Sequence, residues 1–224
     1  MKIVLQTLAS GVIGLVFFAI ALFWPAGTVD YWQAWVFIAV FMVCTMVPSC
    51  YLAVHRPDAL QRRLQAGPIA EDRPVQQILM VALVGSVPAV LVVSALDHRF
   101  GWSRVPVAAV ITAAVVVAVG LLLAQTVVFQ NSFAGASIRV EAEQPLVSTG
   151  LYGLVRHPMY VGALLMMFAT PVALGSYWGV VAASASLPIL GVRILDEEKL
   201  LRAELAGYDA YAEKVRYRLL PYVW

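Results

Sequence analysis

Long apolar runs alternate with short polar connections along this chain, and the lengths of the runs predict its elements. A helix needs about twenty apolar residues to cross a bilayer. Four runs are close to that length: Ile3 to Trp24, Trp32 to Val54, Val75 to Leu96 and Val105 to Phe129. We therefore predict four transmembrane helices within residues 1–129.

Two shorter apolar runs follow, residues 159–174 and 177–192, and the turn residues Gly175 and Ser176 separate them. At about 1.5 Å of rise per residue, each run spans roughly 24 Å. The pattern predicts a helical hairpin over 159–192 that either crosses the membrane or is re-entrant. In total we expect five to six transmembrane helices, followed by a polar tail over 193–224.

Composition agrees with a membrane protein. Of the 224 residues, 62% are hydrophobic and 12% charged, whereas a soluble domain has about 25% charged residues. The mean hydropathy is +0.84. We predict an all-α integral membrane protein that forms a single membrane domain over 1–224, because no repeat or linker divides the chain. The first apolar run is too long for the core of a signal peptide, so we interpret it as a retained anchor.

The basic residues predict the orientation. The connections on one side, 24–31, 97–104 and 175–176, carry only Arg99 and Arg104. The other thirteen of the fifteen Lys and Arg residues lie on the opposite side. Because basic residues concentrate on the cytoplasmic side, we expect both termini and the two long loops to be cytoplasmic, in a bacterial inner membrane.

Charge and cysteine content exclude other partners. A formal net charge of +2 gives no indication of nucleic-acid binding. Cys44 and Cys50 lie in an apolar run without His or further Cys at metal-binding spacing, so we predict no metal.

Two polar clusters bracket the predicted hairpin. One is Arg156-His157-Pro158-Met159-Tyr160-Val161-Gly162, and the other is Arg193 followed by Asp196-Glu197-Glu198. Charged groups at a membrane boundary cost free energy unless they are paired or hydrated, so their concentration at both ends of one hairpin indicates a functional site.

Helical periodicity places one of these carboxylates on an apolar face. From Ile194, steps of four and three reach Glu198, Leu201, Leu205 and Tyr208. We therefore predict that Glu198 points inward, where a buried carboxylate needs a compensating partner. At the end of the fourth apolar run, Gln125 and Asn131 either cap the helix or line the mouth of a substrate path.

These motifs, in this order, resemble a known family. The matching positions are Thr149-Gly150-Leu151-Tyr152, the segment 156–162, Arg193 with Glu197-Glu198, Gly207-Tyr208, Tyr211, Val215 and Pro221. Together they resemble the isoprenylcysteine carboxyl methyltransferase family and its phospholipid methyltransferase relatives over residues 130–224, and we identify the chain as a prokaryotic-type member. Leu151 and Gly153 depart from the family pattern, which often has Pro and a basic or polar residue there.

The resemblance implies an all-helical membrane enzyme that binds S-adenosylmethionine without a Rossmann fold. The sequence agrees, since it has no Gly-x-Gly-x-x-Gly unit between a strand and a helix and no Walker motif. By resemblance, the region 130–224 binds the cofactor. The cofactor-binding residues that we expect are Gly150, Tyr152, His157, Pro158, Tyr160, Gly162, Glu197, Glu198 and Tyr208.

The implied reaction moves a methyl group from a sulfonium by in-line displacement, so the enzyme aligns the groups and excludes water. A carboxylate acceptor needs only orientation, for which Arg193 is the candidate. An amine or thiol acceptor needs a base, for which Glu198, Glu197 and His157 are candidates. We predict Arg193 and Glu198 as catalytic residues.

The predicted acceptor is a lipid or another lipophilic small molecule. It enters from the bilayer between the fourth span and the hairpin, while the cofactor enters from the cytosol. Gln125, Asn131 and Arg193 are the predicted substrate-binding residues.

Two other functions stay open. Membrane sterol reductases, which bind NADPH, share a related C-terminal architecture. They typically have Asn after His-Pro and an acidic residue after the Gly, where this chain has Met159 and Ala163. A non-catalytic transporter or scaffold explains the spans but not the position of Glu198 on an apolar face.

Overall fold

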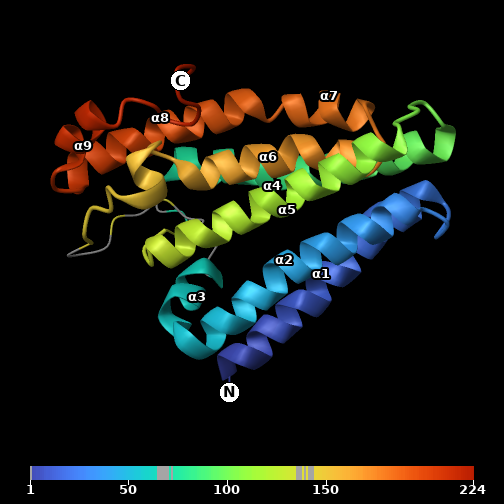
Figure 1. Cartoon of the computed structure of the whole chain (residues 1–224), viewed down its shortest axis with the longest axis horizontal. Coiled ribbons are helices and arrows are strands. Elements are labelled where there is room, and N and C mark those ends of the chain that lie inside the picture. Colours follow the sequence, from blue (N-terminus) through green and yellow to red (C-terminus); the bar gives the residue numbers. More distant parts are fainter. Residues whose placement is uncertain (1, 65–70, 72, 135–137, 139, 141–143) are drawn as a thin grey trace.

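The computed structural model describes residues 2–64, 71, 73–134, 138, 140 and 144–224 (Figure 1). Apart from Met1, the remaining residues fall in the two long loops that we expect to be cytoplasmic, so those parts of the loops lie outside the described residues. The helices are α1 (Lys2–Ala26), α2 (Trp32–His55), α3 (Pro57–Leu64), α4 (Pro74–Phe100), α5 (Val107–Gln130), the 3₁₀ turn η2 (Gly150–Gly153), α6 (Pro158–Ala173), α7 (Trp178–Ser184), α8 (Leu187–Glu204) and α9 (Tyr208–Lys214).

The predicted all-α membrane fold is confirmed, and the ranges that the structure describes contain no Rossmann-type sheet. Five segments have the length and hydropathy of membrane spans: Ile3–Ala26, Trp32–His55, Pro74–Phe100, Val107–Gln130 and Trp178–Glu204. All four long apolar runs are therefore helical. The shorter apolar helix, α6, has 16 residues and extends over roughly 24 Å.

The second arm of the hairpin differs from the expectation. It consists of α7 and α8, and α8 continues without a break through 192–193, where the sequence changes from apolar to polar. Pro188 stands in the first turn of α8, a position that Pro favours. The helix then runs on because its polar side chains Arg193 and Glu198 are buried and paired. Residues of the membrane hairpin and of the tail thus share one rigid helix.

Helices α5 and α6 cross with their backbones almost in contact. A Cβ atom added to Gly120 would lie 2.7 Å from the carbonyl oxygen of Gly162, and one added to Gly162 would lie 2.6 Å from that of Gly120. Small residues allow such close approach between membrane helices. This crossing fixes α6, and with it the polar cluster at the start of α6, against α5 (Figure 1).

At the end of the bundle away from α3 and α9, a small polar network joins the helices. Asp97, at the end of α4, is 1% exposed. It accepts hydrogen bonds from the hydroxyls of Ser103 at 2.6 Å and Ser176 at 2.5 Å. These bonds tie the α4–α5 connection to the α6–α7 turn. The polar clusters named above all lie at the other end of the bundle, with α3 and α9 (Figure 1).

Candidate active site

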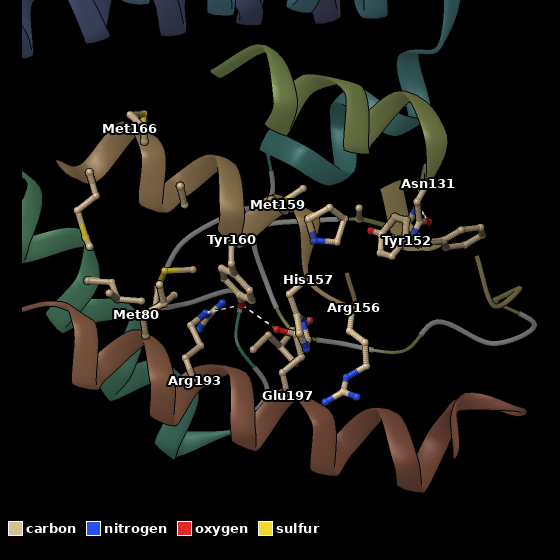
Figure 2. Close-up of a pocket in the computed structure, with 18 of the residues that line it drawn as sticks. Met80, Asn131, Tyr152, Arg156, His157, Met159, Tyr160, Met166, Arg193 and Glu197 are labelled. Carbon is tan, nitrogen blue, oxygen red and sulfur yellow. Dashed lines mark hydrogen bonds and ion pairs between the residues drawn. The ribbon is translucent and has the colours of Figure 1, made fainter. Parts of the chain in front are cut away.

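A cavity of about 510 Å³ runs from the end of the bundle that carries α9 into its apolar interior, between α4 and α6. Its polar half is lined by Asn131, Tyr152, Arg156, His157, Tyr160, Arg193, Glu197, Tyr208 and Tyr211, several of which converge in Figure 2. Its other half is lined almost entirely by apolar side chains of α1, α2, α4 and α6. The molecule therefore joins a polar compartment to an apolar one in a single space.

The apolar half is a slot between two helical stripes. The lining positions recur every three to four residues, as one helix face requires: Met80, Leu83, Val87 and Leu91 on α4, and Met159, Ala163, Met166 and Thr170 on α6. Each stripe spans twelve residues, and the eleven steps between its ends extend over roughly 16 Å. Three phenylalanines close the slot, with ring centroids 5.4 Å (Phe18–Phe37) and 4.6 Å (Phe18–Phe41) apart.

Glu197 is the carboxylate that faces the cavity. Its side chain is 21% exposed, and its Oε2 accepts a hydrogen bond from the Tyr160 hydroxyl at 2.7 Å. The Nδ1 atom of His157 lies 4.0 Å from Oε1 of Glu197 (Figure 2). Glu197, Tyr160 and His157 therefore stand together at the polar end.

Glu198, the next residue, is turned away from the cavity and is fully engaged. It is 3% exposed, as its place on the apolar stripe predicts. Its Oε1 accepts from Arg156 Nε at 2.7 Å and from His157 Nε2 at 3.2 Å, and its Oε2 accepts from Arg218 Nε at 3.0 Å. Glu198 is thus the centre of a buried clamp that holds the start of α6 to the C-terminal segment.

The protonation of His157 follows from this clamp. A carboxylate only accepts hydrogen bonds, so His157 Nε2 carries the proton that it donates to Glu198. In the neutral imidazole the other nitrogen, Nδ1, is then an acceptor. Pro158, the next residue, is the first residue of α6. The N–H at that position has no partner within a helix, so proline loses no hydrogen bond there. Nδ1 of His157 consequently faces the cavity wall, 4.0 Å from Oε1 of Glu197.

Arg156 connects the clamp to the tail. Its Nη1 donates to the carbonyls of Ala212, Val215 and Arg216 at 3.3, 3.1 and 3.2 Å. The backbone joins in, since the N–H groups of residues 156 and 157 donate to the carbonyls of residues 217 and 218, each at 2.9 Å. The tail is thereby fixed as one wall of the polar half.

Arg193 is only 2% exposed, although it borders the cavity. Its guanidinium donates to Tyr160 Oη at 3.1 Å, to Gln76 Oε1 at 2.8 Å and to Glu71 Oε1 at 2.7 Å. The structure therefore holds this side chain firmly between α4, α6 and the segment before α4.

Burial keeps the tyrosines of the polar half protonated. Desolvation raises the pKa of Tyr152 to about 12, with Glu197 adding to the rise and a hydrogen bond from Asn131 opposing it. Burial and then the charge of Glu198 raise the pKa of Tyr208 well above its usual value. The Tyr208 hydroxyl is buried and has no hydrogen-bond partner in the part of the chain that the structure describes. A buried donor without a partner at a cavity wall needs an explanation, and a ligand supplies one.

Besides Glu198, three predicted residues lie outside the cavity lining. Gly150 has φ +61° and packs under Gln130, whose Oε1 accepts from the N–H of Leu151 at 3.1 Å. Gly162 lies in the crossing with α5, and Gln125 is buried on α5. The other predicted residues, apart from Glu198, all line the cavity: Tyr152, His157, Pro158, Tyr160, Glu197, Tyr208, Asn131 and Arg193.

The predicted entry route between α5 and the hairpin stays a prediction. The two helices are in close contact at Gly120 and Gly162, and the apolar part of the cavity lies on the other side of α6, between α6 and α4, with Asn131 at the polar end.

Several residues that build the site were not among the predicted site residues, although Arg156 belongs to the motif quoted above. Glu71 and Gln76 hold Arg193, and Arg156 and Arg218 hold Glu198. Gln76 gave a signal, because a polar residue early in an apolar run requires a buried partner. Glu71 and Arg218 lie in polar segments, where one more charged residue carries no signal.

The fold defines a polytopic helical membrane protein with a cavity that begins at one end of the bundle and continues into its interior. Residues 108–205 match the model of the family described as phospholipid methyltransferase. This match confirms the family resemblance that the motifs predicted.

Two individual proteins are similar to the chain. A mouse (Mus musculus) Delta(14)-sterol reductase, TM7SF2, is 33% identical over 84 residues, which cover 35% of this chain and 20% of the reductase. The chain thus spans about a fifth of the length of that relative. The solved structure of the eukaryotic intramembrane Ras methyltransferase ICMT (isoprenylcysteine carboxyl methyltransferase) superimposes with a TM-score of 0.55 over 99% of this chain and 97% of that one. At 17% identity, this likeness establishes a common fold.

Proposed function

We propose that the chain is an integral membrane methyltransferase that uses S-adenosylmethionine and acts on a lipophilic acceptor carrying a carboxylate, thiol or amine. One observation carries this proposal. A single cavity joins a polar end, lined by the Glu197 carboxylate and by Tyr208, whose hydroxyl has no partner among the described residues, to an apolar slot about 16 Å long within the bundle. The family match over residues 108–205 supports the same reaction class.

The polar half fits the cofactor in chemistry. The volume of the whole cavity, about 510 Å³, falls in the range of small-molecule sites. S-adenosylmethionine supplies a methyl group on a positively charged sulfur when bound. Glu197 is suited to accept from its ammonium or ribose groups, and the Tyr208 hydroxyl finds there the partner that the described residues do not give it. The rings of Tyr152 and Tyr160 add faces that attract a cation.

The apolar slot fits the acceptor. Its methionines are flexible and adapt to irregular apolar chains. Val87 of α4 lines the slot and is 47% exposed on the surface of the bundle, which supports entry from the lipid beside α4. The acceptor then reaches the polar end through the apolar slot, while the cofactor enters from the end of the bundle that carries α9. Together the two ligands exclude water from the space between them.

The residues where the polar half meets the apolar slot have different proposed roles, which depend on the kind of acceptor. For an amine or thiol acceptor, His157 Nδ1 is the best placed base, because Glu198 fixes its other nitrogen as the donor. Glu198 then acts as a positioning residue. For a carboxylate acceptor, Arg193 at the cavity wall supplies the orienting charge.

We further propose that the chain is a prokaryotic-type member of its family in a bacterial inner membrane, with both termini and the cofactor entrance in the cytoplasm. The distribution of Lys and Arg supports this orientation.

A reductase is the second candidate, because the sterol reductase matches part of the chain. Calorimetry of the detergent-purified protein with S-adenosylhomocysteine and with NADPH separates the two. We expect S-adenosylhomocysteine to bind and NADPH not to bind. The reverse result would establish the reductase, and binding of neither would favour a non-catalytic role.

A further inference from the structure

Glu71 is a buried carboxylate outside the family-matched segment and outside the cavity lining. Its side chain is 0% exposed. Oε1 accepts from Arg193 Nη2 at 2.7 Å, and Oε2 accepts from the N–H of Ile138 at 3.0 Å. Its own carbonyl accepts from the Gln77 side chain at 2.9 Å. Glu71 therefore connects its own segment, before α4, to Ile138 and to the guanidinium of Arg193 on α8.

Arg193 is held on its other sides by groups that are themselves fixed. Gln76 accepts from Nη1 of Arg193 at 2.8 Å and donates to Asp196. Asp196 is in turn paired with Arg73 at 2.7 Å. The guanidinium fork has a rigid planar geometry, so acceptors on two of its edges set the direction of its remaining N–H groups.

The directions of the hydrogen bonds along the next two links follow from the donor inventory. A guanidinium only donates, so the Tyr160 oxygen must accept from Arg193 Nε at 3.1 Å. The single proton of Tyr160 is then directed to Glu197 Oε2 at 2.7 Å. The order Glu71, Arg193, Tyr160, Glu197 thus runs from the interior to the cavity (Figure 2 shows its last three members).

We propose that Glu71 is a positioning residue of the cofactor site, which acts through Arg193 and Tyr160 to hold Glu197 in its cavity-facing position. Glu71 compensates the buried charge of Arg193. Without that carboxylate, two anions remain one hydrogen-bonded group away from Arg193: Asp196 through Gln76 and Glu197 through Tyr160. Asp196 is already paired with Arg73, so Arg193 draws Glu197 away from the ligand. This proposal rests on the proposed function, because it assigns Glu197 to the cofactor.

The test is a binding cycle in the full-length, detergent-purified protein, with S-adenosylhomocysteine as the probe in calorimetry. Glu71→Gln keeps the shape of the side chain and removes its charge. We expect this variant to bind about tenfold more weakly, a loss of one well-placed hydrogen bond to a charged group. Glu213→Gln, the same change at an exposed position of α9, serves as the matched control and keeps wild-type affinity.

The second arm separates positioning from simple bracing. In a Tyr160→Phe background the route from Glu71 to Glu197 is already cut, so Glu71→Gln should cause less than a twofold further loss. A brace that only stabilises the fold would lower the melting temperature equally in both backgrounds and leave the affinity of the folded protein unchanged, and this result would overturn the proposal.

A third variant keeps the test informative if Glu71→Gln folds poorly. That single change leaves the buried Arg193 charge uncompensated. The double variant Glu71→Gln/Arg193→Met removes both charges. It is expected to fold, and still to bind about tenfold more weakly because Tyr160 has lost its donor. Wild-type affinity in this variant would overturn the proposal alone, whereas absence of binding by the wild type would overturn the proposed function together with it.

Discussion

The two halves of the cavity are built in different ways. The polar half consists of motif residues, such as His157, Glu197 and Tyr208, that charged and backbone hydrogen bonds hold in place. Apart from Met159, the apolar half consists of side chains outside the motifs, and its α1, α2 and α4 walls lie outside the family-matched residues 108–205. The difference teaches that one half fixes the chemistry while the other half is free to set which acceptor fits. The predictions below test whether the two halves act separately.

The largest effect is expected from Glu198→Gln, which removes the charge at the centre of the clamp. Arg156 and Arg218 then lose their carboxylate, and breaking a buried ion pair in this way costs about 3–5 kcal/mol. We expect a clearly lower melting temperature and at least tenfold weaker binding of S-adenosylhomocysteine.

Glu204→Gln, an exposed position on the same helix, is the control and should behave as the wild type. Unchanged affinity in a folded Glu198→Gln protein would mean that the clamp does not shape the polar half.

Met166→Trp is expected to act on the apolar half alone. The larger ring fills the slot between α4 and α6, so methyl transfer to a lipophilic acceptor should fall about tenfold or more, as overpacking costs about 1–3 kcal/mol. Transfer of radiolabelled methyl groups into the organic phase of membrane extracts measures this loss.

Affinity for S-adenosylhomocysteine should stay at the wild-type value in the same variant. Phe168→Trp is the matched control, since Phe168 lies on α6 but lines a groove on its other side. A joint loss of acceptor turnover and cofactor affinity in Met166→Trp would show that the halves are coupled.

The smallest effect is expected from Tyr208→Phe, which deletes the hydroxyl that has no partner within the described residues. The protein should be as stable as the wild type or slightly more stable, and S-adenosylhomocysteine should bind about three- to tenfold more weakly, since one hydrogen bond contributes about 0.5–1.5 kcal/mol. Tyr211→Phe is the comparison, because its hydroxyl already donates to the Tyr152 carbonyl at 2.7 Å. It should lower stability instead, and the opposite assignment of the two effects would contradict the ligand role of Tyr208.

The sequence was sufficient to predict the fold because membrane spans are defined by a length of apolar chain, which can be read directly. It also predicted the burial of Glu198, because helical periodicity depends only on neighbours along the chain. The different roles of Glu197 and Glu198 could not be predicted, since they depend on partners such as Arg218 that the fold brings together.

The same reason explains the residues that were missed or placed differently. Glu71 meets Arg193 from 122 positions away, and no local pattern encodes that contact. Gly162 belongs to a recognisable motif, but a glycine indicates only that something approaches closely. Here the approaching group is the backbone of α5 at Gly120.

The crossing at Gly120 and Gly162 also determines which helices around the cavity can move. Two helices whose carbonyl oxygens occupy the place of side chains cannot roll or slide past each other without a clash, so α5 and α6 behave as one stationary wall. Any widening that admits a bulky chain must then come from the facing wall. That wall is α4, and it contains Pro88, which removes one backbone hydrogen bond in the stretch that borders the slot. The site thus has one fixed wall, which carries His157 and Tyr160, and one deformable wall, α4, which carries no catalytic group. α4 can therefore move to accommodate acceptors of different size without disturbing the alignment on which methyl transfer depends.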